Sequence, residues 1–287
     1  MTGVMARRPR LRFPGAVYHV MARGNRRLPI FHDVLDRLRF LRIVERATGL
    51  YRARVFALCL MGNHFHIVLD TPRGNISETM QYINGVFAQI SNRRYAQTGH
   101  VFEARFRSLL IQRETYLKRA ARYVVRNPVR AGLVSQVSEW KWSTYRATAG
   151  LEPAPSWLDV GWLDRAFQTP ARDEAQRRYM RYVNAPTPRR PPRTPQAEVY
   201  GSPQFKARVA AALREVHADR PVPRSVEVIL RPNLATLFAV SASSRQERDR
   251  MIEASRTQYG YRVAEIARFL GIHPSTVSRV SHRNHRG

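Results

Sequence analysis

The chain has 287 residues, enough for one large domain or two modest ones. It carries 49 Lys and Arg residues against 21 Asp and Glu, a net charge of +28, which indicates a polyanionic partner, most simply nucleic acid. No apolar run reaches the ~18 residues needed to cross a bilayer, and the single cysteine, Cys59, excludes an intramolecular disulfide and a cysteine-rich zinc site. We therefore expect a cytoplasmic, nucleoid-associated protein that does not enter the membrane.

Strands and helices alternate in the pattern of the first half. Strands are predicted at 16–22, 54–61, 64–70 and 101–112, and helices at 33–47, 76–95 and 115–127. Gly49 suits the end of the first helix, Gly62-Asn63 suits a hairpin turn, and Pro128 is expected to stop the last helix. The order of strand, helix, hairpin, helix and strand is ferredoxin-like. We predict an α+β fold with an antiparallel sheet and one extra helix.

Two histidines alternate in the predicted strand at 64–70. Because alternate side chains of a strand share a face, His64 and His66 present their imidazoles on the same side. Two imidazoles on a rigid backbone form a ready pair of metal ligands. Ordinary strand histidines can have the same spacing, so the pair alone does not decide between the two interpretations.

A tyrosine and an asparagine share one face of the extra helix, because Tyr123 and Asn127 are four residues apart. Asn127 can offer an amide oxygen to a metal, and the phenol of Tyr123 becomes a useful nucleophile when a metal polarises the electrophile. On the residues alone, Tyr123 could also be a core aromatic. Asn127, directly before a proline, could be an ordinary helix terminator.

Five ordered motifs in the first half, taken together, resemble a known family. They are GAVYHV at 15–20, RGN at 23–25, MGNHFH at 61–66, GHVFEARF at 99–106 and YVVRNPVRAGLV at 123–134. This half resembles the single-tyrosine, HUH-type transposases of insertion sequences, and most of all the REP-associated tyrosine transposases. It departs from the family in the turn before the histidines, which reads Met-Gly-Asn where Met-Pro-Asn is common.

The resemblance implies a metal-dependent DNA transposase and endonuclease. It assigns His64, His66 and Asn127 to a divalent metal, Mg²⁺ or Mn²⁺, and Tyr123 to attack on single-stranded DNA beside a REP-like hairpin. The implied intermediate is a 5′-phosphotyrosine, from which strands can be rejoined without ATP. A transposase-derived DNA-binding regulator that does not cut, and a metal-dependent hydrolase that uses water, are the alternatives. Related enzymes can take the tyrosine helix from a partner subunit, so the oligomeric state stays open.

Further residues of the first half are predicted to contact DNA. His19 lies on the first strand, which neighbours the third in a ferredoxin-like sheet, and Arg23 and Arg26 follow it. Arg105 and Arg107 share one face of the predicted fourth strand. Such groups would orient a phosphate. Each arginine could instead belong to a solvated surface, and His19 could be a packed strand histidine.

The second half contains a predicted helix-turn-helix near 261–281. An apolar helical stripe is followed by Gly271, which allows a sharp turn, and by Pro274, which suits a first helical position. The residues expected to face the major groove of duplex DNA are Ser275, Thr276, Ser278 and Arg279. A plain helical hairpin would share this pattern.

Three regions are predicted from these observations. Residues 1–150 form the transposase domain, and residues 151–200 form a helical segment with a Pro/Arg-rich linker, PTPRRPPRTP at 186–195. Residues 201–287 form a mostly helical DNA-binding domain.

Overall fold

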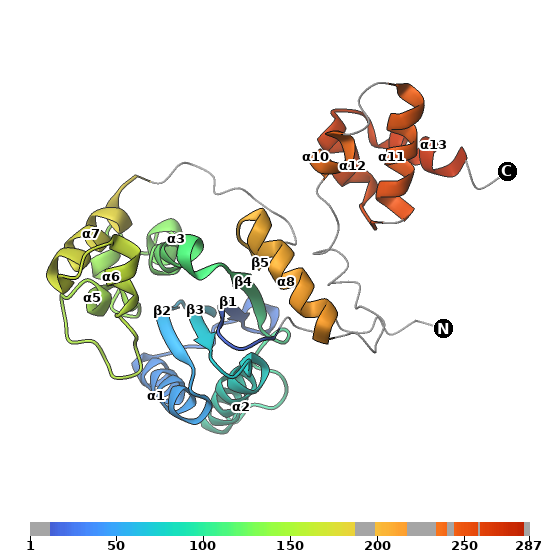
Figure 1. Ribbon diagram of the computed structural model, residues 1–287. Coiled ribbons are helices and arrows are strands. Elements are labelled where there is room, and N and C mark those ends of the chain that lie inside the picture. Colours follow the sequence, from blue (N-terminus) through green and yellow to red (C-terminus); the bar gives the residue numbers. More distant parts are fainter. Residues whose placement is uncertain (1–11, 187–198, 217–233, 240–243, 258, 284–287) are drawn as a thin grey trace. The chain divides into compact units, whose positions relative to one another are not determined.

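The computed structural model describes residues 12–186, 199–216, 234–239, 244–257 and 259–283. The described residues fall into two compact units, one within residues 12–202 and one within residues 203–283 (Figure 1). Most of the Pro/Arg-rich tract predicted as a linker lies outside the described residues. Within them, no helix is long and apolar enough to cross a membrane.

A five-stranded sheet forms the centre of the first unit. Its strands are β1 (Ala16–Arg23), β2 (Arg54–Leu60), β3 (His64–Thr71), β4 (Arg107–Ile111) and β5 (Val199–Tyr200). They lie in the order β2-β3-β1-β4-β5, with β5 parallel to β4 and all other neighbours antiparallel (Figure 1). The first four strands have the order of a ferredoxin-like sheet, so the predicted fold class is confirmed.

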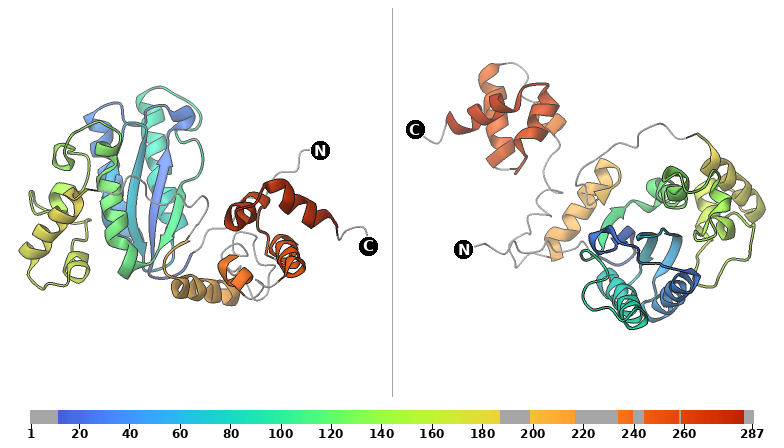
Figure 2. Two further views of the ribbon diagram at one scale, coloured as in Figure 1. Left: turned by 90° about the horizontal axis from the view of Figure 1, so that it is seen from above. Right: turned by 180° about the vertical axis from the view of Figure 1, so that it is seen from behind.

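Helices cover both faces of this sheet, as Figures 1 and 2 show. Helices α1 (Val34–Tyr51) and α2 (Ile76–Arg94) pack on one face, where the ring of Phe40 contacts those of Phe65 and Phe87. Helix α3 (Arg113–Val125) packs on the other face through an apolar stripe that includes Leu117 and Ala121. Each strand alternates between the two cores, which leaves the α3 face to carry the side chains of His64 and His66.

Further helices extend the α3 side of the first unit. They are α4 (Asn127–Arg130), α5 (Tyr145–Thr148), α6 (Trp162–Phe167) and α7 (Arg172–Asn184). Trp162 and Tyr179 are buried in the same apolar cluster as Ala121 and Val124 of α3. The first unit therefore continues to Ser202, past the boundary expected near residue 150. The reason is that helices from residues 151–186 pack onto α3, the helix that carries Tyr123 and is called the tyrosine helix below.

Two helix ends differ from the prediction. Helix α1 passes through Gly49 and ends at Tyr51, and the residue that follows it, Arg52, takes the left-handed conformation with a φ of 57°. Pro128 does not stop the helical path, because it stands near the start of α4, where its missing N–H is tolerated. The backbone N–H of Arg130 donates to the carbonyl of Arg126 at 3.0 Å, so the backbone continues in a helical turn beyond the end of α3.

The fourth strand is shorter than predicted. It begins at Arg107, while residues 101–106 form bends, with an isolated bridge between Phe102 and Gly24. Arg105 therefore lies in a bend before the strand and does not share a strand face with Arg107. The bridge to Gly24 takes the place of the ladder that a longer strand would have formed.

The second unit contains helices α8 (Pro203–Val216), α10 (Leu234–Ala239), α11 (Arg245–Thr257), α12 (Val263–Leu270) and α13 (Pro274–Arg283). Ile252, Ile266 and Val277 from the last three helices meet in one apolar cluster and are fully buried. Gly271 joins α12 to α13 with a φ of 66°, a conformation that favours glycine. The predicted helix-turn-helix is confirmed.

Candidate active site

The candidate site lies on the α3 face of the sheet, where β1 and β3 are neighbours. Met21 faces His66 and Arg23 faces His64 across the antiparallel pair. Directly opposed residues project to the same side, so His19, two residues before Met21, shares this face with both predicted metal ligands. His19 therefore lies on the same face of the sheet as His64 and His66, and its role as a DNA contact stays a prediction.

Ring contacts bring three histidines and the tyrosine together. The ring centroid of His66 lies 5.1 Å from that of His19 and 5.1 Å from that of His64. The ring of Tyr123, from α3 of the same chain, lies 5.5 Å from His19 and 5.8 Å from His66, both edge to face. Among the described residues the Tyr123 hydroxyl has no hydrogen-bond partner. The half-buried phenol of Tyr123 therefore packs against imidazole rings that belong to the same chain.

Asn127 sits at the first residue of α4, next to the end of the tyrosine helix. Its amide nitrogen donates to the backbone carbonyls of Tyr123, at 2.8 Å, and Val124, at 3.2 Å. These bonds fix the side-chain amide with its nitrogen toward α3, and its oxygen is left as the group that a cation or a water could bind.

Burial keeps the imidazoles of the cluster neutral. Desolvation lowers the pKa of His19 to about 4, and desolvation together with the charge of Arg23 lowers the pKa of His64 to about 4. The pKa of His66 is held well below its usual range, mainly by burial and then by His19, His64, Arg23 and Arg130. Neutral imidazole is the form that coordinates metals, so all three rings are in that form at neutral pH.

Two arginines add positive charge beside the rings. The Nε atom of Arg23 is buried and has no hydrogen-bond partner in the described part of the chain. The guanidinium carbon of Arg130 lies 4.7 Å from the ring centroid of Tyr123. An anionic oxygen at this site would meet both cations, which suits a phosphate.

Sequence reasoning missed Arg130 as a site residue. It follows Tyr123 by seven positions and Asn127 by three, a spacing that places all three on one helical face. Because Pro128 was expected to end the helix, Arg130 was not placed on the same helical face as Tyr123 and Asn127. Asn63 was also missed, although it directly precedes His64, and its hydrogen bonds are described below.

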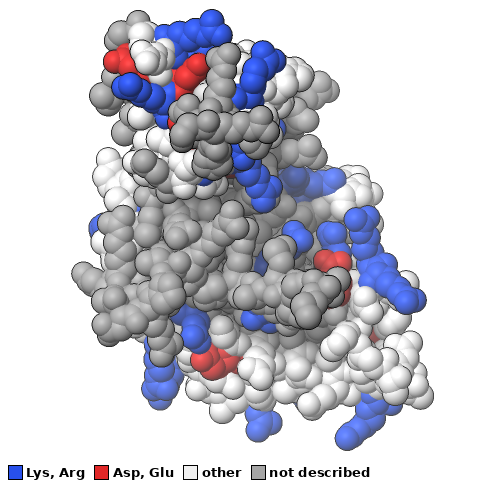
Figure 3. Space-filling model, turned by 90° about the vertical axis from the view of Figure 1, so that its right-hand side faces the viewer, with Lys and Arg blue, Asp and Glu red and all other residues white. Residues whose placement is uncertain are grey.

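The remaining predicted DNA contacts of the first unit lie outside the ring cluster, which consists of His19, His64, His66 and Tyr123. Arg26 is exposed in the 3-10 turn η1 (Asn25–Arg27), Arg105 is exposed in the bend before β4, and Arg107 is exposed on β4, opposite Met21. On the face drawn in Figure 3, basic side chains are spread widely and acidic ones are few. These arginines remain predicted DNA contacts.

The predicted major-groove residues all lie on α13 of the second unit. Ser275 and Arg279 are exposed, and Thr276 and Ser278 are half-buried. Val277, between them, is fully buried in the core of this unit. The helix is therefore anchored in the core by Val277, while Ser275 and Arg279 point to its exposed side.

The donor set of the ring cluster can be tested for its fit to a metal. Within the described residues, no group of three or more His, Cys, Asp or Glu side chains could hold a metal ion. Two imidazoles and one amide oxygen are nevertheless suitable donors for a divalent cation, with substrate oxygens or water completing its shell. The residues present at this site fit such a cation.

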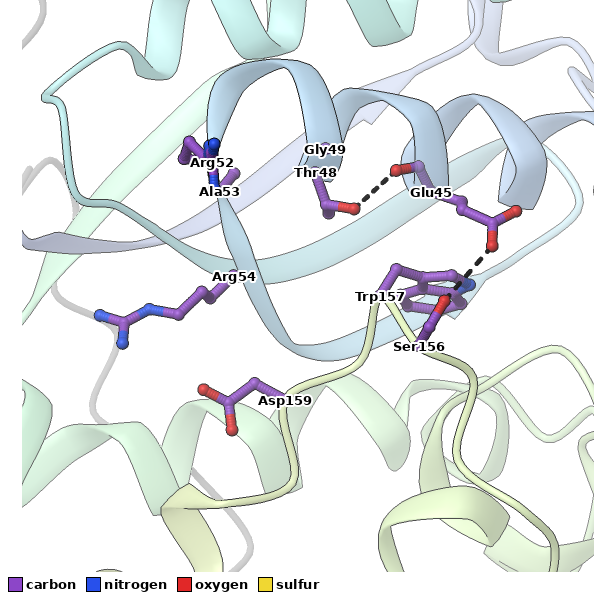
Figure 4. Close-up of a pocket in the computed structure, with 9 residues that line it drawn as sticks. All are labelled: Glu45, Thr48, Gly49, Arg52, Ala53, Arg54, Ser156, Trp157 and Asp159. Atoms are coloured by element: carbon purple, nitrogen blue, oxygen red, sulfur yellow. Dashed lines mark hydrogen bonds between the residues drawn. The ribbon is translucent and has the colours of Figure 1, made fainter.

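A separate hollow of about 620 Å³ lies where α1 ends and β2 begins (Figure 4). Its lining is Glu45, Thr48, Gly49, Arg52, Ala53, Arg54, Ser156, Trp157 and Asp159. Arg54 faces Asp70 at the end of β3 opposite to His64. The hollow thus contains none of the predicted site residues, and its lining mixes acidic and basic groups.

Comparisons with known proteins agree with the two parts of the chain. Residues 13–127 match the family model described as transposase IS200 like, and residues 242–287 match that of a homeodomain-like domain. No curated protein matches the sequence. A solved structure of a REP-associated tyrosine transposase bound to a REP hairpin is similar, with 20% identity and a TM-score of 0.45 over 54% of this chain and 93% of that one. The match at 13–127 confirms the predicted resemblance of the first half to the IS200-like transposases, and the matched range includes His64, His66, Tyr123 and Asn127.

Proposed function

We propose that this protein is a metal-dependent single-strand DNA transposase that cleaves beside DNA hairpins through a 5′-phosphotyrosine intermediate and can rejoin strands. The transposase family match at 13–127 supports the reaction class. The observation that carries the proposal is the contact of the Tyr123 ring with the rings of His19 and His66, at 5.5 and 5.8 Å within one chain. Such a DNA substrate would place the protein at the nucleoid in the cytoplasm.

His64 and His66, with the amide oxygen of Asn127, would hold Mg²⁺ or Mn²⁺. When bound, the cation would withdraw charge from the scissile phosphate and so favour attack by a phenol. Neutral imidazoles at this position support the assignment, because a protonated ring cannot coordinate.

The chain's own cations would orient the scissile phosphate. Arg23 brings a buried Nε–H without a partner in the described residues, and such a donor gains a charge-assisted bond when a phosphate oxygen binds. Arg130 stacks on the Tyr123 ring and would hold the phenol while stabilising its anion. In the reaction, Tyr123 would lose its phenolic proton as its oxygen bonds to phosphorus, the bond from phosphorus to the 3′ oxygen would break, and that oxygen would take up a proton to give a free 3′ hydroxyl.

The helix-turn-helix would bind duplex DNA beside the folded single strand. The exposed polar groups of α13, including Ser275 and Arg279, have the placement of a recognition helix, whose outward residues enter the major groove. The homeodomain-like match at 242–287 supports this assignment.

A covalent-adduct assay tests the proposal. The protein is incubated with Mn²⁺ and an end-labelled single-stranded REP-like hairpin, and the products are run on denaturing gels. We expect a protein–DNA adduct that disappears in Tyr123→Phe and persists in Tyr116→Phe. Tyr116 is the matched control, because it lies on the same helix and its ring contacts Tyr200, away from the histidines.

Two other outcomes would contradict the proposal and identify the alternatives. Free cut ends that persist in Tyr123→Phe would indicate a metal-dependent hydrolase with water as the nucleophile. Binding of the hairpin without any cleavage by the unaltered protein would indicate a non-cutting regulator.

A further inference from the structure

The hydrogen bonds of Asn63 determine which nitrogen of His64 carries the proton. The Asn63 side-chain nitrogen donates to the backbone carbonyl of Arg27 at 2.8 Å, and its Oδ1 atom lies 2.7 Å from Nδ1 of His64. A backbone carbonyl can only accept, so the amide group must turn its nitrogen toward Arg27 and its oxygen toward His64. An amide oxygen also only accepts. His64 must therefore carry its hydrogen on Nδ1, which leaves the lone pair on Nε2.

The turn that supplies the Arg27 carbonyl is itself fixed. Arg26 and Arg27 take the left-handed conformation, with φ of 51° and 61°, which residues other than glycine rarely adopt. The backbone N–H of Gly24 donates to the Asn63 carbonyl at 2.8 Å, and that of Leu28 donates to the Asn25 carbonyl at 3.0 Å. The turn thus holds Asn63 through both its backbone and its side chain.

His66 has an equivalent partner in His19. Its Nδ1 atom lies 3.0 Å from Nε2 of His19, so one of the two rings donates to the other. When His66 donates, its own Nε2 atom keeps a lone pair. His19 then accepts through Nε2 and carries its hydrogen on Nδ1. Both strand histidines would therefore be held through Nδ1 by a polar neighbour.

We propose that Asn63 and His19 are positioning residues that hold His64 and His66 in the tautomer in which both present Nε2 to one shared divalent cation. The inference rests on the metal of the proposed function. Metal-binding histidines commonly donate their second ring N–H to a polar partner, which fixes the ring and strengthens the ligand. Here the partners are neutral, an amide and a third imidazole.

Two measurements test the proposal without relying on DNA cleavage. Long-range ¹H–¹⁵N spectra of the metal-free protein report which ring nitrogen of each histidine is protonated. Calorimetric titration with Mn²⁺ alone reports the affinity. In the unaltered protein we expect Nδ1–H on His64 and His66 and one bound Mn²⁺ per chain.

The variants separate positioning from general damage. Asn63→Ala and His19→Ala are expected to weaken Mn²⁺ binding by about 10- to 100-fold, the usual effect of losing such a partner, and to leave His64 or His66 with mixed tautomers. Asn63→Asp keeps an oxygen that accepts from Nδ1–H of His64 but loses the donor to the Arg27 carbonyl, so it should recover only part of the affinity. Asn92→Ala is the matched control, since this amide also donates to a backbone carbonyl, that of Gly99, but contacts no imidazole.

The failure of this proposal can be distinguished from the failure of the proposed function. If Asn63→Ala and His19→Ala bind Mn²⁺ as tightly as the unaltered protein and keep its tautomers, the positioning role is overturned while the metal site stands. If the unaltered protein binds no Mn²⁺, the metal in the proposed function is wrong, and this inference falls with it.

Discussion

Asp70 ties the start of the tyrosine helix to the sheet, and its replacement by Asn is expected to destabilise the first unit. Asp70 is fully buried at the end of β3. It accepts two hydrogen bonds from Arg54, at 3.0 and 2.5 Å, and one from Arg113, the first residue of α3. In Asp70→Asn the shape is kept, but the charge is lost and one oxygen becomes an NH₂ group that faces guanidinium donors.

The magnitude follows from the exposure of the two partners. Breaking a buried ion pair typically costs about 3–5 kcal/mol, because a charge is left without a partner. The side chains of Arg54 and Arg113 are 49% and 24% exposed and can turn toward water, so we expect the lower end, about 3 kcal/mol. For a unit of this size that corresponds to a fall in Tm of roughly 6–12 °C.

The assay is thermal and urea unfolding of the full chain, followed by circular dichroism. Glu152→Gln is the matched control, because it makes the same chemical change in a pair whose members, Glu152 and Arg146, are 41% and 38% exposed. We expect that control to change stability by no more than about 1 kcal/mol. If Asp70→Asn is as mild as the control, the buried carboxylate does not secure the tyrosine helix and the reasoning is refuted.

Further predictions concern both units. Val277→Ala should lower the urea stability of the second unit by about 2 kcal/mol, because Val277 is fully buried, and an unchanged transition would contradict that packing. Arg279→Ala should weaken duplex binding by about 10- to 100-fold in fluorescence anisotropy at fixed salt, and equal affinity would remove α13 as the recognition helix. Bonds from Arg94 and a backbone N–H hold the pKa of Asp33 well below its usual range, so Asp33 contributes stability above about pH 4 that is lost as the pH falls further. Asp33→Asn should therefore lose less stability than the unaltered protein between pH 4 and pH 2, and parallel urea midpoints would contradict this. Burial raises the pKa of the Cys59 thiol far above its usual value, so Cys59 should react with an alkylating reagent only on unfolding, and rapid labelling of the folded protein would show otherwise.

The sequence predicted the features that depend on local periodicity. The alternation of His64 and His66 in a strand, and the turn at Gly271 between two helices, follow from side-chain spacing and backbone conformation alone. The neighbouring positions of β1 and β3 followed from the order of the elements. These local and topological rules sufficed to place His19 beside the histidine pair.

Features that depend on the packing of distant segments could not be predicted. Arg130 was missed because Pro128 usually ends a helix, whereas here it stands near the start of the next one. Trp162 and Tyr179 gave no functional or structural signal, since nothing in their local spacing says that they pack against the tyrosine helix. Asn63 required the path of the turn at Arg27, which depends on contacts formed only in the fold.

The short strand β5 determines where the chain leaves the first unit. Ala185 is held by Arg122, and residues 199–200 are fastened to β4, with the Gln112 side chain accepting from the N–H of Ser202. Tyr200 and Ser202 are thus both held by Gln112, the residue directly before α3: its backbone N–H donates to the Tyr200 carbonyl at 2.7 Å and its side-chain oxygen accepts from Ser202. A change in β5 would therefore reach the first turn of the helix that carries Tyr123.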